Sequence, residues 1–348
     1  MSRTFAPNFF ATAVGSLPHI DPVRACELVQ KFLPDLPAWP QLPRRDPRES
    51  IYAQFSRDFP GAHFADGRVV VNLAHDESAD LERLYTRYLE KDFDAVAINA
   101  NDAAGLAQFA TMNWDSARAV KGHLIGPISW GLTVTDPSRR SILYDEVLAD
   151  AVAKHLHLHA AWQERELEKL SRQTIMFVDE PYLASFGSAY VAVERDQVIG
   201  LIEEVFSALH GLKGIHCCGN TDWSLLLSTS LDILNFDAHN FAETLALYPG
   251  AVRAFLDRGG MIAWGIVPVA NDADVMGATA EGLVERLDGA IHLISSRGVP
   301  LDMLIHASLV TPACGMGTLS ERAAERSLEL LAQVSRRMRE KYFHEVET

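Results

Sequence analysis

Short runs of apolar and β-branched residues alternate with longer segments of helical period along the whole chain. This alternation is typical of parallel strands joined by crossover helices. Eight such runs can be placed, and they centre on Phe10, Val96, Leu124, Met176, His216, Leu234, Ala263 and Ile305. Eight strands with intervening helices is the count of an α/β barrel, and 348 residues suit one barrel with insertions. The sequence therefore predicts a single (β/α)8 TIM barrel that spans residues 1–348.

One stretch departs from this alternation. Between Lys31 and Leu73, prolines recur every three or four residues from Pro34 to Pro47, and a strand-like run, Val69–Leu73, follows them. We interpret residues 31 to about 90 as an insertion after the first strand, a loop with a hairpin that covers one face of the barrel. The insertion also carries a basic patch that either holds an anionic substrate or pairs with nearby acids, formed by Arg44, Arg45 and Arg48.

The composition excludes several classes of protein. Hydrophobic residues make up 48% and charged residues 22% of the chain, as in an ordinary globular protein. A formal net charge of −15 argues against binding to nucleic acid or to an anionic membrane, both of which favour a basic surface. No apolar run approaches the ~18 residues of a membrane span, and the N-terminus lacks a signal-peptide pattern. We expect a cytoplasmic protein without nucleic-acid or membrane partners.

The segment Gly214–Asn220, which reads Gly-Ile-His-Cys-Cys-Gly-Asn, carries the sharpest chemical pattern. Side chains alternate between the two faces of a strand, so His216 and Cys218 point one way and Cys217 points the other way. Zinc favours mixed nitrogen and sulfur ligands, which this pair offers. Taken alone, the segment is equally compatible with a buried cysteine pair beside a core histidine.

Cys314, just past the eighth run, favours the metal site. The carboxyl ends of all strands in a barrel meet on one face, so Cys314 can lie beside His216 and Cys218. Three protein ligands with one exchangeable position are typical of catalytic Zn2+. Asp237, after the sixth run, is a candidate fourth ligand through oxygen, unless it caps the next helix. Two weaker candidates for that position are His239 and Glu243.

Two further segments lie at predicted strand ends. In Asp179-Glu180-Pro181, a carboxylate at the barrel mouth could bind an ammonium group or pair with a loop arginine. In Val14-Gly15-Ser16, small residues let backbone amides approach an anion, although the same residues also suit an ordinary turn.

Three histidines are weaker candidates for function. His155, His157 and His159 lie in a segment of helical period, 145–170, and only His155 and His159 share a face at the spacing that can bind metal. Because no third ligand lies nearby in the sequence, we predict that these histidines line a solvated helix face.

With these residues in view, the chain resembles the catalytic barrel of cobalamin-independent methionine synthase, within a superfamily shared with uroporphyrinogen decarboxylase and corrinoid:thiol methyltransferases. The resemblance covers most of the chain in the right order. It implies that Val14-Gly15-Ser16 holds the homocysteine carboxylate and that Asp179 binds its amine. It also implies a pocket wall at Trp130, after a matching Gly126-Pro127. The implied zinc ligands are His216, Cys218 and Cys314.

The chain departs from the pattern of this family at three positions. Asp237 stands where the family has a glutamate zinc ligand, and Asn101 falls near its second amine-binding carboxylate. No histidine occupies residues 265–268, where the family has the acid that protonates the folate leaving group. By contrast, His216–Thr221 closely resembles a segment of corrinoid:thiol methyltransferases. The chain is similar to short "core" methionine synthases.

These features together predict a zinc-dependent methyltransferase. Its acceptor would be a small thiol, most simply homocysteine, with Asp179 as the group that orients it. The missing acid favours a methyl-corrinoid donor, methylcobalamin or a corrinoid carrier protein, over methyl-tetrahydrofolate. Two other functions stay open: a metal-free decarboxylase of the uroporphyrinogen type, which would use the arginines near Arg44, and a non-enzymatic zinc or corrinoid carrier.

Overall fold

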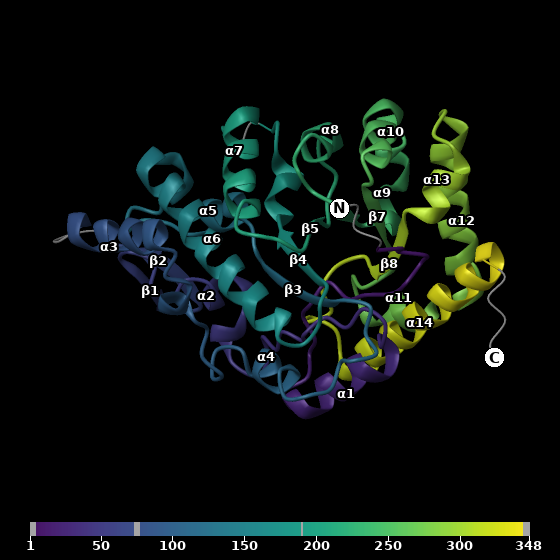
Figure 1. The fold of residues 1–348 in the computed structure, drawn as a ribbon, viewed down its shortest axis with the longest axis horizontal. Coiled ribbons are helices and arrows are strands. Elements are labelled where there is room, and N and C mark those ends of the chain that lie inside the picture. The colour runs from purple at the N-terminus through teal and green to yellow at the C-terminus, as the bar shows by residue number, and fades with distance from the viewer. Residues whose placement is uncertain (1–4, 73–76, 189–190, 344–348) are drawn as a thin grey trace.

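A parallel, curled six-stranded sheet forms the centre of the molecule. The computed structural model describes residues 5–72, 77–188 and 191–343. The strands pair in the order β3-β4-β5-β6-β7-β8, so that each neighbours the next in sequence. They are β3 (Val120–Ile125), β4 (Thr174–Asp179), β5 (Leu212–Cys217), β6 (Ile233–Phe236), β7 (Met261–Val267) and β8 (Ser308–Pro312). Figure 1 shows this sheet with helices packed outside it.

Six strands rather than eight form this sheet, so the predicted strand count of the barrel is wrong. Two irregular segments lie where the first and second strands were expected. Near Phe10, the backbone pairs with β8 through a bridge between Ala11 and Val310. Near Ala38, the backbone pairs with β3 at Lys121. The two segments also bridge to each other, so the ring closes through isolated bridges instead of continuous ladders.

The position beside β3 corrects a second prediction. We expected a strand around Val96, but Phe93–Val96 is a short 3-10 helix, η2. Residues 37–41 of the proline-rich stretch lie there instead, with Trp39 N donating to Lys121 O at 3.2 Å. Proline has no N–H to donate to a ladder, which explains why this part of the ring is irregular. The run near Ile305 also divides, because Ile305 lies in a helix that ends at His306 and β8 begins at Ser308.

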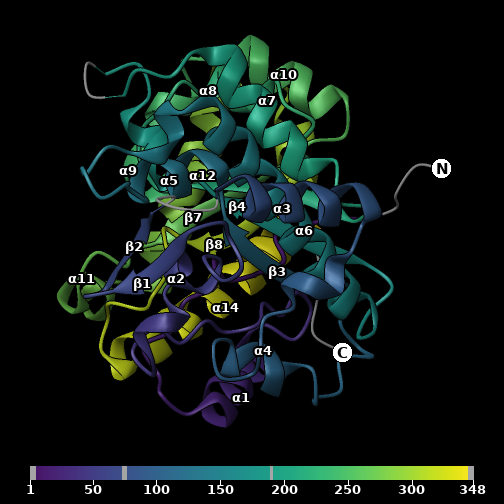
Figure 2. The same ribbon diagram turned by 90° about the vertical axis from the view of Figure 1, so that its left-hand side faces the viewer.

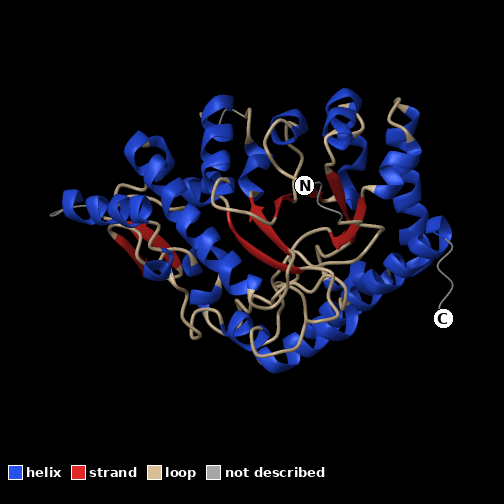
Figure 3. Ribbon diagram, viewed as in Figure 1, coloured by secondary structure: helices blue, strands red, loops and turns tan. Residues whose placement is uncertain are grey.

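Helices cover the outside of the sheet (Figures 2 and 3). No helix in the described part of the chain is both long and apolar enough to cross a membrane. The α-helices are α1 (Pro22–Phe32), α2 (Ile51–Gln54), α3 (Glu77–Glu90), α4 (Ala104–Phe109), α5 (Pro127–Thr133), α6 (Glu146–Glu168), α7 (Arg195–Phe206), α8 (Trp223–Leu227), α9 (Ala238–Leu245), α10 (Pro249–Asp257), α11 (Asp272–Gly277), α12 (Ala280–Ser296), α13 (Leu301–His306) and α14 (Glu321–Phe343). Three further short 3-10 helices are η1 (Pro47–Glu49), η3 (Ile142–Tyr144) and η4 (Pro181–Ser185).

The expected hairpin is present as β1 (Ala62–Ala65) and β2 (Arg68–Val71), which pair antiparallel. The two residues between them, Asp66 and Gly67, both have positive φ, which suits a tight two-residue hairpin turn. Val71 N donates to Thr135 O at 2.9 Å and so ties the hairpin to the loop after α5. Leu73, at the end of the predicted strand-like run, lies outside the described residues.

Helix α6 overturns the expectation of a solvated histidine face. His155 and His159 are fully buried, and their Nε2 atoms lie 3.1 Å apart. Aromatic rings from the insertion pack edge-on against them, Phe59 on His155 and Phe55 on His159. The insertion thus covers a helix face that the periodicity of α6 alone assigned to solvent.

The side chains inside the ring are apolar at one end of the strands and polar at the other. An apolar cluster fills one end, made of Phe10, Leu36, Ala119, Ile175, Phe177, Leu212, Ile233, Met261, Ala263 and Leu309. At the next inward positions toward the carboxyl ends of the strands, buried polar residues follow, including Lys121, His123, Asp179, His216 and Asn235. Since side chains alternate along each strand, this apolar floor supports a polar chamber at the carboxyl face.

Glu180, just after β4, joins this chamber to helix α5. Its fully buried carboxylate accepts hydrogen bonds from Ile128 N at 2.9 Å, Ser129 N at 2.8 Å and Ser129 Oγ at 2.6 Å. A Cβ atom at Gly126 would lie 2.2 Å from Glu180 Cδ, so glycine is required where the two segments meet. The Gly-Pro and Asp-Glu-Pro motifs therefore fit together in space.

We predict that Glu180→Ala lowers the free energy of unfolding by about 3 kcal/mol, because three donors lose their buried acceptor. Urea denaturation of the purified variant measures the change. Glu168→Ala on the exposed side of α6 is the matched control, with an expected change within about 0.5 kcal/mol. Equal stability of the two variants would contradict the structural role of Glu180.

Candidate metal centre

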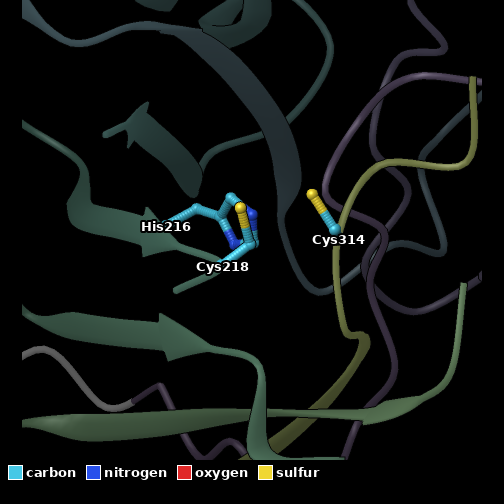
Figure 4. A group of neighbouring side chains, drawn as sticks. All are labelled: His216, Cys218 and Cys314. Atoms are coloured by element: carbon cyan, nitrogen blue, oxygen red, sulfur yellow. The ribbon is translucent and has the colours of Figure 1, made fainter. Parts of the chain in front are cut away.

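Three residues of the chain bring metal-ligating atoms together inside the carboxyl face. The atoms offered by His216, Cys218 and Cys314 all lie within 4.8 Å of one another. His216 lies on β5, Cys218 directly follows that strand, and Cys314 reaches the same point from the loop after β8 (Figure 4). The structure thus brings Cys314 to the two predicted ligands of the β5 strand end, about a hundred residues earlier in the sequence.

The imidazole of His216 is oriented by Asn235 on the neighbouring strand. Asn235 Nδ2 donates to Ala263 O at 2.8 Å and to Thr311 Oγ1 at 2.7 Å. Its Oδ1 is therefore left as the acceptor for His216 Nδ1, at 2.6 Å. With the proton on Nδ1, the lone pair of Nε2 is free, and this buried atom has no hydrogen-bond partner among the described residues. Metal-ligating histidines commonly have this second partner on the other ring nitrogen.

The two sulfurs of this cluster affect each other's acidity. The neighbouring Cys314 thiol lowers the pKa of Cys218 to about 4, burial opposes this shift, and the nearby imidazole of His216 adds to it. The neighbouring Cys218 and burial raise the pKa of Cys314 well above its ordinary value. A thiolate is the form that binds metals, and metal binding releases thiol protons. The orphaned nitrogen and the paired sulfurs fit a divalent metal that favours nitrogen and sulfur, as zinc does.

Cys217, by contrast, points away from this cluster. It is fully buried, and its thiol donates to Gly219 O at 3.5 Å. Burial raises its pKa to about 12, so the group stays a protonated thiol at neutral pH. The alternation of side chains along β5 therefore separates one reactive cysteine from one inert neighbour.

Asp237 lies near the cluster but is occupied by another contact. Its carboxylate accepts from Asn240 N at 3.0 Å and from Asn240 Nδ2 at 2.7 Å, which caps the start of α9. It does not belong to the group of atoms within 4.8 Å. His239, another residue of this loop, has its Nδ1 3.1 Å from Ile266 O. Asp237 could coordinate a metal only after releasing the helix start.

Two cavities meet at the sulfurs. The larger, with a volume of about 950 Å³, opens above the cluster and has walls that include Arg44, Asp237, His239 and Val269. The smaller, about 130 Å³, has walls that include Val14, His123, Asp179 and His216. Both are lined by Ser16, Gln41, Ile51, Cys218, Cys314 and Gly315. A group held by the cysteines would therefore be accessible from both sides.

Asp179 presents an unpartnered carboxylate oxygen to the smaller cavity. Asp179 is only 7% exposed, and its Oδ1 has no hydrogen-bond partner among the described residues. Burial raises its pKa to about 6, while His216 and Lys121 act in the opposite direction. Asp179 forms no ion pair with an arginine among the described residues. The oxygen is therefore available to accept from a ligand.

The Val14-Gly15-Ser16 segment forms one wall of the same cavity. Ser16 Oγ accepts from Gly317 N at 3.2 Å, and Val14 O accepts from Lys121 Nζ at 2.7 Å. Gly15 is required by a close approach, because a Cβ atom there would lie 2.5 Å from His123 Cε1. The segment is held from both sides and faces the cavity through Val14 and Ser16.

Three predicted binding residues, Gly15, Trp130 and Asn101, are not among those that line either cavity. Trp130 is fully buried and donates to Tyr52 O at 2.9 Å, so it supports Tyr52, which lines the larger cavity. Asn101 is exposed, and its carbonyl accepts from Arg45. Because residues 37–41 hold the place beside β3, the residue at that edge is Gln41 instead. Gln41 is buried and donates to Gln54 Oε1 at 2.8 Å.

Lys121 and His123 also face this chamber, and sequence reasoning missed both. Lys121 is fully buried, and burial lowers its pKa to about 7 against the attraction of Asp179. The sequence did contain a signal for them: two ionisable residues at alternate positions of an apolar strand, Val120–Ile125.

The predicted basic patch is only partly at the site. Arg44 lines the larger cavity, whereas Arg45 and Arg48 pair with Glu49 and Asp46.

Fold and site together define a TIM-barrel-like α/β protein with a candidate metal cluster at the carboxyl ends of its strands. No protein-family model matches the chain, and no curated protein matches its sequence. Among solved structures, it is similar to a B12-independent methionine synthase from Shewanella sp. W3-18-1 in complex with selenomethionine. The TM-score is 0.63 at 19% identity, over 97% of this chain and 99% of that chain.

A second solved structure shares the fold. It is a methyltransferase from Methanosarcina mazei, with a TM-score of 0.55 at 10% identity, over 96% of this chain and 94% of that chain. Both matches extend over nearly the whole length of each partner. At these identities, the comparisons show a common fold.

We predict that Cys218→Ala abolishes tight zinc binding, because it removes the thiolate of the cluster. Cys217→Ala, its matched control, should retain wild-type zinc affinity, since its thiol lies on the other face of β5. Competition with a chromogenic chelator measures both affinities. The opposite pattern would mean that the register of the strand end is wrong.

Proposed function

We propose that the protein is a zinc-dependent methyltransferase that transfers a methyl group to a thiol, with homocysteine as acceptor and methionine as product. One observation carries the proposal. The unpartnered Nε2 of His216 and the sulfurs of Cys218 and Cys314 lie within 4.8 Å of one another, where two cavities meet. The fold shared with a methionine synthase and a methyltransferase supports it.

His216, Cys218 and Cys314 would hold the zinc, with Asp237 as an oxygen ligand when it leaves the start of α9. Bound zinc deprotonates a coordinated thiol, whose pKa is otherwise about 8.5, and so supplies a nucleophilic thiolate at neutral pH. Asn235 keeps the proton of His216 on Nδ1 and leaves Nε2 free to coordinate. The chain's part in catalysis is then to orient the acceptor and the donor on the two sides of the sulfurs.

Asp179 would orient the acceptor from the smaller cavity. Its unpartnered oxygen can accept from the ammonium group of an amino-acid thiol, while Ser16 and its neighbours lie on the carboxylate side. A zinc carrier without catalysis has no use for a buried, unpartnered carboxylate beside the metal. A decarboxylase that binds several carboxylates is also disfavoured, because Arg45 and Arg48 already pair with acids of the insertion.

The methyl donor would enter the larger cavity, and we propose a methyl-corrinoid, free or on a carrier protein. The wall of that cavity after β7 is formed by Pro268, Val269 and Ala270, which offer no acid to a leaving nitrogen. A corrinoid donor leaves as reduced cobalt and needs no such acid. Methyl-tetrahydrofolate, the other donor, would require a proton from His239 or Asp274, which line the same cavity.

The first test is the metal. Purified protein should hold about one zinc per chain, and chelation should abolish the methylation of homocysteine. Added zinc should restore it, and magnesium, which favours oxygen ligands, should not. Elemental analysis and methionine formation are the measurements. Zinc-free protein with undiminished activity would rule out the proposed chemistry.

The second test is the donor. Zinc-loaded enzyme and homocysteine are incubated separately with methylcobalamin and with methyl-tetrahydrofolate, and methionine is measured. We expect turnover with the corrinoid and ~10²–10⁴-fold slower turnover with the folate, the usual cost of a missing general acid. Equal or faster turnover with folate would overturn the donor assignment. His239→Ala and Asp274→Ala would then identify the residue that supplies the proton.

A further inference from the structure

His123, on β3, has a ring that is locked in one orientation. The ring stacks on Trp39 at 4.2 Å between centroids and 20° between planes. Its other side meets the backbone at Gly15, where no Cβ atom would fit. Gln163 on α6 fixes both partners, since its Oε1 accepts from Trp39 Nε1 at 2.8 Å and from His123 N at 2.9 Å. Such a locked ring is preorganised to recognise a ligand.

Both ring nitrogens of His123 are buried and have no hydrogen-bond partner among the described residues. Buried polar atoms are nearly always paired, so an unpaired ring that lines a cavity points to a missing ligand. Three other buried histidines of the described chain each have a hydrogen-bonding neighbour: His155 with Phe55 O, His159 with His155, and His216 with Asn235. The ring of His19 also lacks a hydrogen bond, but its Nε2 lies 3.6 Å from Glu325 Oε1, and His19 lines neither cavity.

The cavity that His123 lines is also lined by Asp179, whose buried Oδ1 lacks a hydrogen-bond partner among the described residues. Burial, reinforced by the Lys121 ammonium, lowers the pKa of His123 well below its ordinary value, so the ring is neutral with one N–H. One end of the cavity therefore offers a donor near a lysine, and the other offers a carboxylate. A volume of about 130 Å³ equals about four waters and suits an amino-acid head group.

We infer that His123 is a specificity residue that binds the carboxylate of the amino-acid acceptor, opposite the ammonium site at Asp179. The ring N–H donates to the carboxylate inside the cavity that Ser16 also lines. His123 is not a metal ligand, because it is not part of the cluster of ligand atoms within 4.8 Å. This inference rests on the proposed amino-acid thiol acceptor, which it extends by a second contact to the head group.

The test measures binding of L-methionine, which needs no methyl donor, to proteins of equal zinc content by titration calorimetry. Two further ligands each lack one charged group: the des-amino analogue keeps the carboxylate, and the decarboxylated analogue keeps the amine. The variants are His123→Leu, which removes the polar atoms, and His123→Gln, which keeps a donor. His159→Leu, another buried histidine outside both cavities, is the matched control for folding.

His123→Leu should weaken binding of methionine and of the des-amino analogue about 10- to 100-fold, the worth of a hydrogen bond to a charged group. Binding of the decarboxylated analogue should change by less than about threefold, since its partner atom is absent. His123→Gln should recover much of the affinity, and His159→Leu should leave all three unchanged relative to wild type. This pattern separates recognition from a loss of folding, which would affect every ligand alike.

Three results would overturn the inference: unchanged methionine affinity in His123→Leu, an equal loss for all three ligands, or a loss of zinc. A different result would overturn the proposed function. If the wild type binds methionine in this pattern but transfers no methyl group to homocysteine, the assignment of His123 stands and the reaction does not. If the wild type binds neither methionine nor homocysteine, the acceptor assignment and the role of His123 fall together.

Discussion

The side-chain amide of Asn235 is the contact on which the arrangement of the site depends. It accepts from His216 on β5 and donates to Ala263 O on β7 and Thr311 Oγ1 on β8. One buried group thus connects four consecutive strands from inside the ring. Because an unpaired buried donor or acceptor costs about 1–3 kcal/mol, alternative positions of these strands are disfavoured. Thr311 lies three residues before Cys314, so the same amide orients His216 and anchors the segment that carries Cys314.

The proline-rich closure of the ring has a direct consequence for the cavities. A regular ladder would use the backbone polar groups of both edge segments. Here the segments near Ser16 and Gln41 meet through an isolated bridge, with Leu17 N donating to Gln41 O at 2.8 Å and Gln41 N to Gly15 O at 3.2 Å. The side chains of Ser16 and Gln41 then line both cavities. The irregular part of the ring is therefore also the part that supplies polar wall to the site.

The strands β3 to β8 could be predicted because short runs rich in apolar residues alternate with helical segments; β4 and β7 are nearly continuous apolar runs, as expected for strands buried on both faces. The inward pair His216 and Cys218 followed from the same alternation. The segment that pairs with β3 could not be predicted, because Pro37 and Pro40 interrupt the apolar and β-branched pattern by which a strand is recognised in a sequence. The apolar residues near Val96 imitate that pattern in a 3-10 helix. Asn101 was placed in the pocket by the family resemblance, and Gln41 was missed.

The burial of His155 and His159 depends on a contact between distant segments, which no local pattern contains. The periodicity of α6 describes one helix, whereas the rings that cover these histidines come from Phe55 and Phe59 in the insertion. His123 differs, because its position on an apolar strand was visible in the sequence. Its missing hydrogen bonds were not, since they depend on the rings and backbone that surround it in space.

In the proposed reaction, the two cavities would separate the acceptor from the donor. The smaller one places polar groups of opposite character at fixed positions, Asp179 and His123, and would favour one kind of head group. The larger one is lined after β7 by Pro268, Val269 and Ala270. Cys218 and Cys314 line both cavities, so a thiolate held there could be fixed on one side while a bulky methyl carrier approaches from the other. Under this proposal, selectivity for the acceptor would depend on a few buried side chains, and access of the donor would depend on the size of the larger cavity.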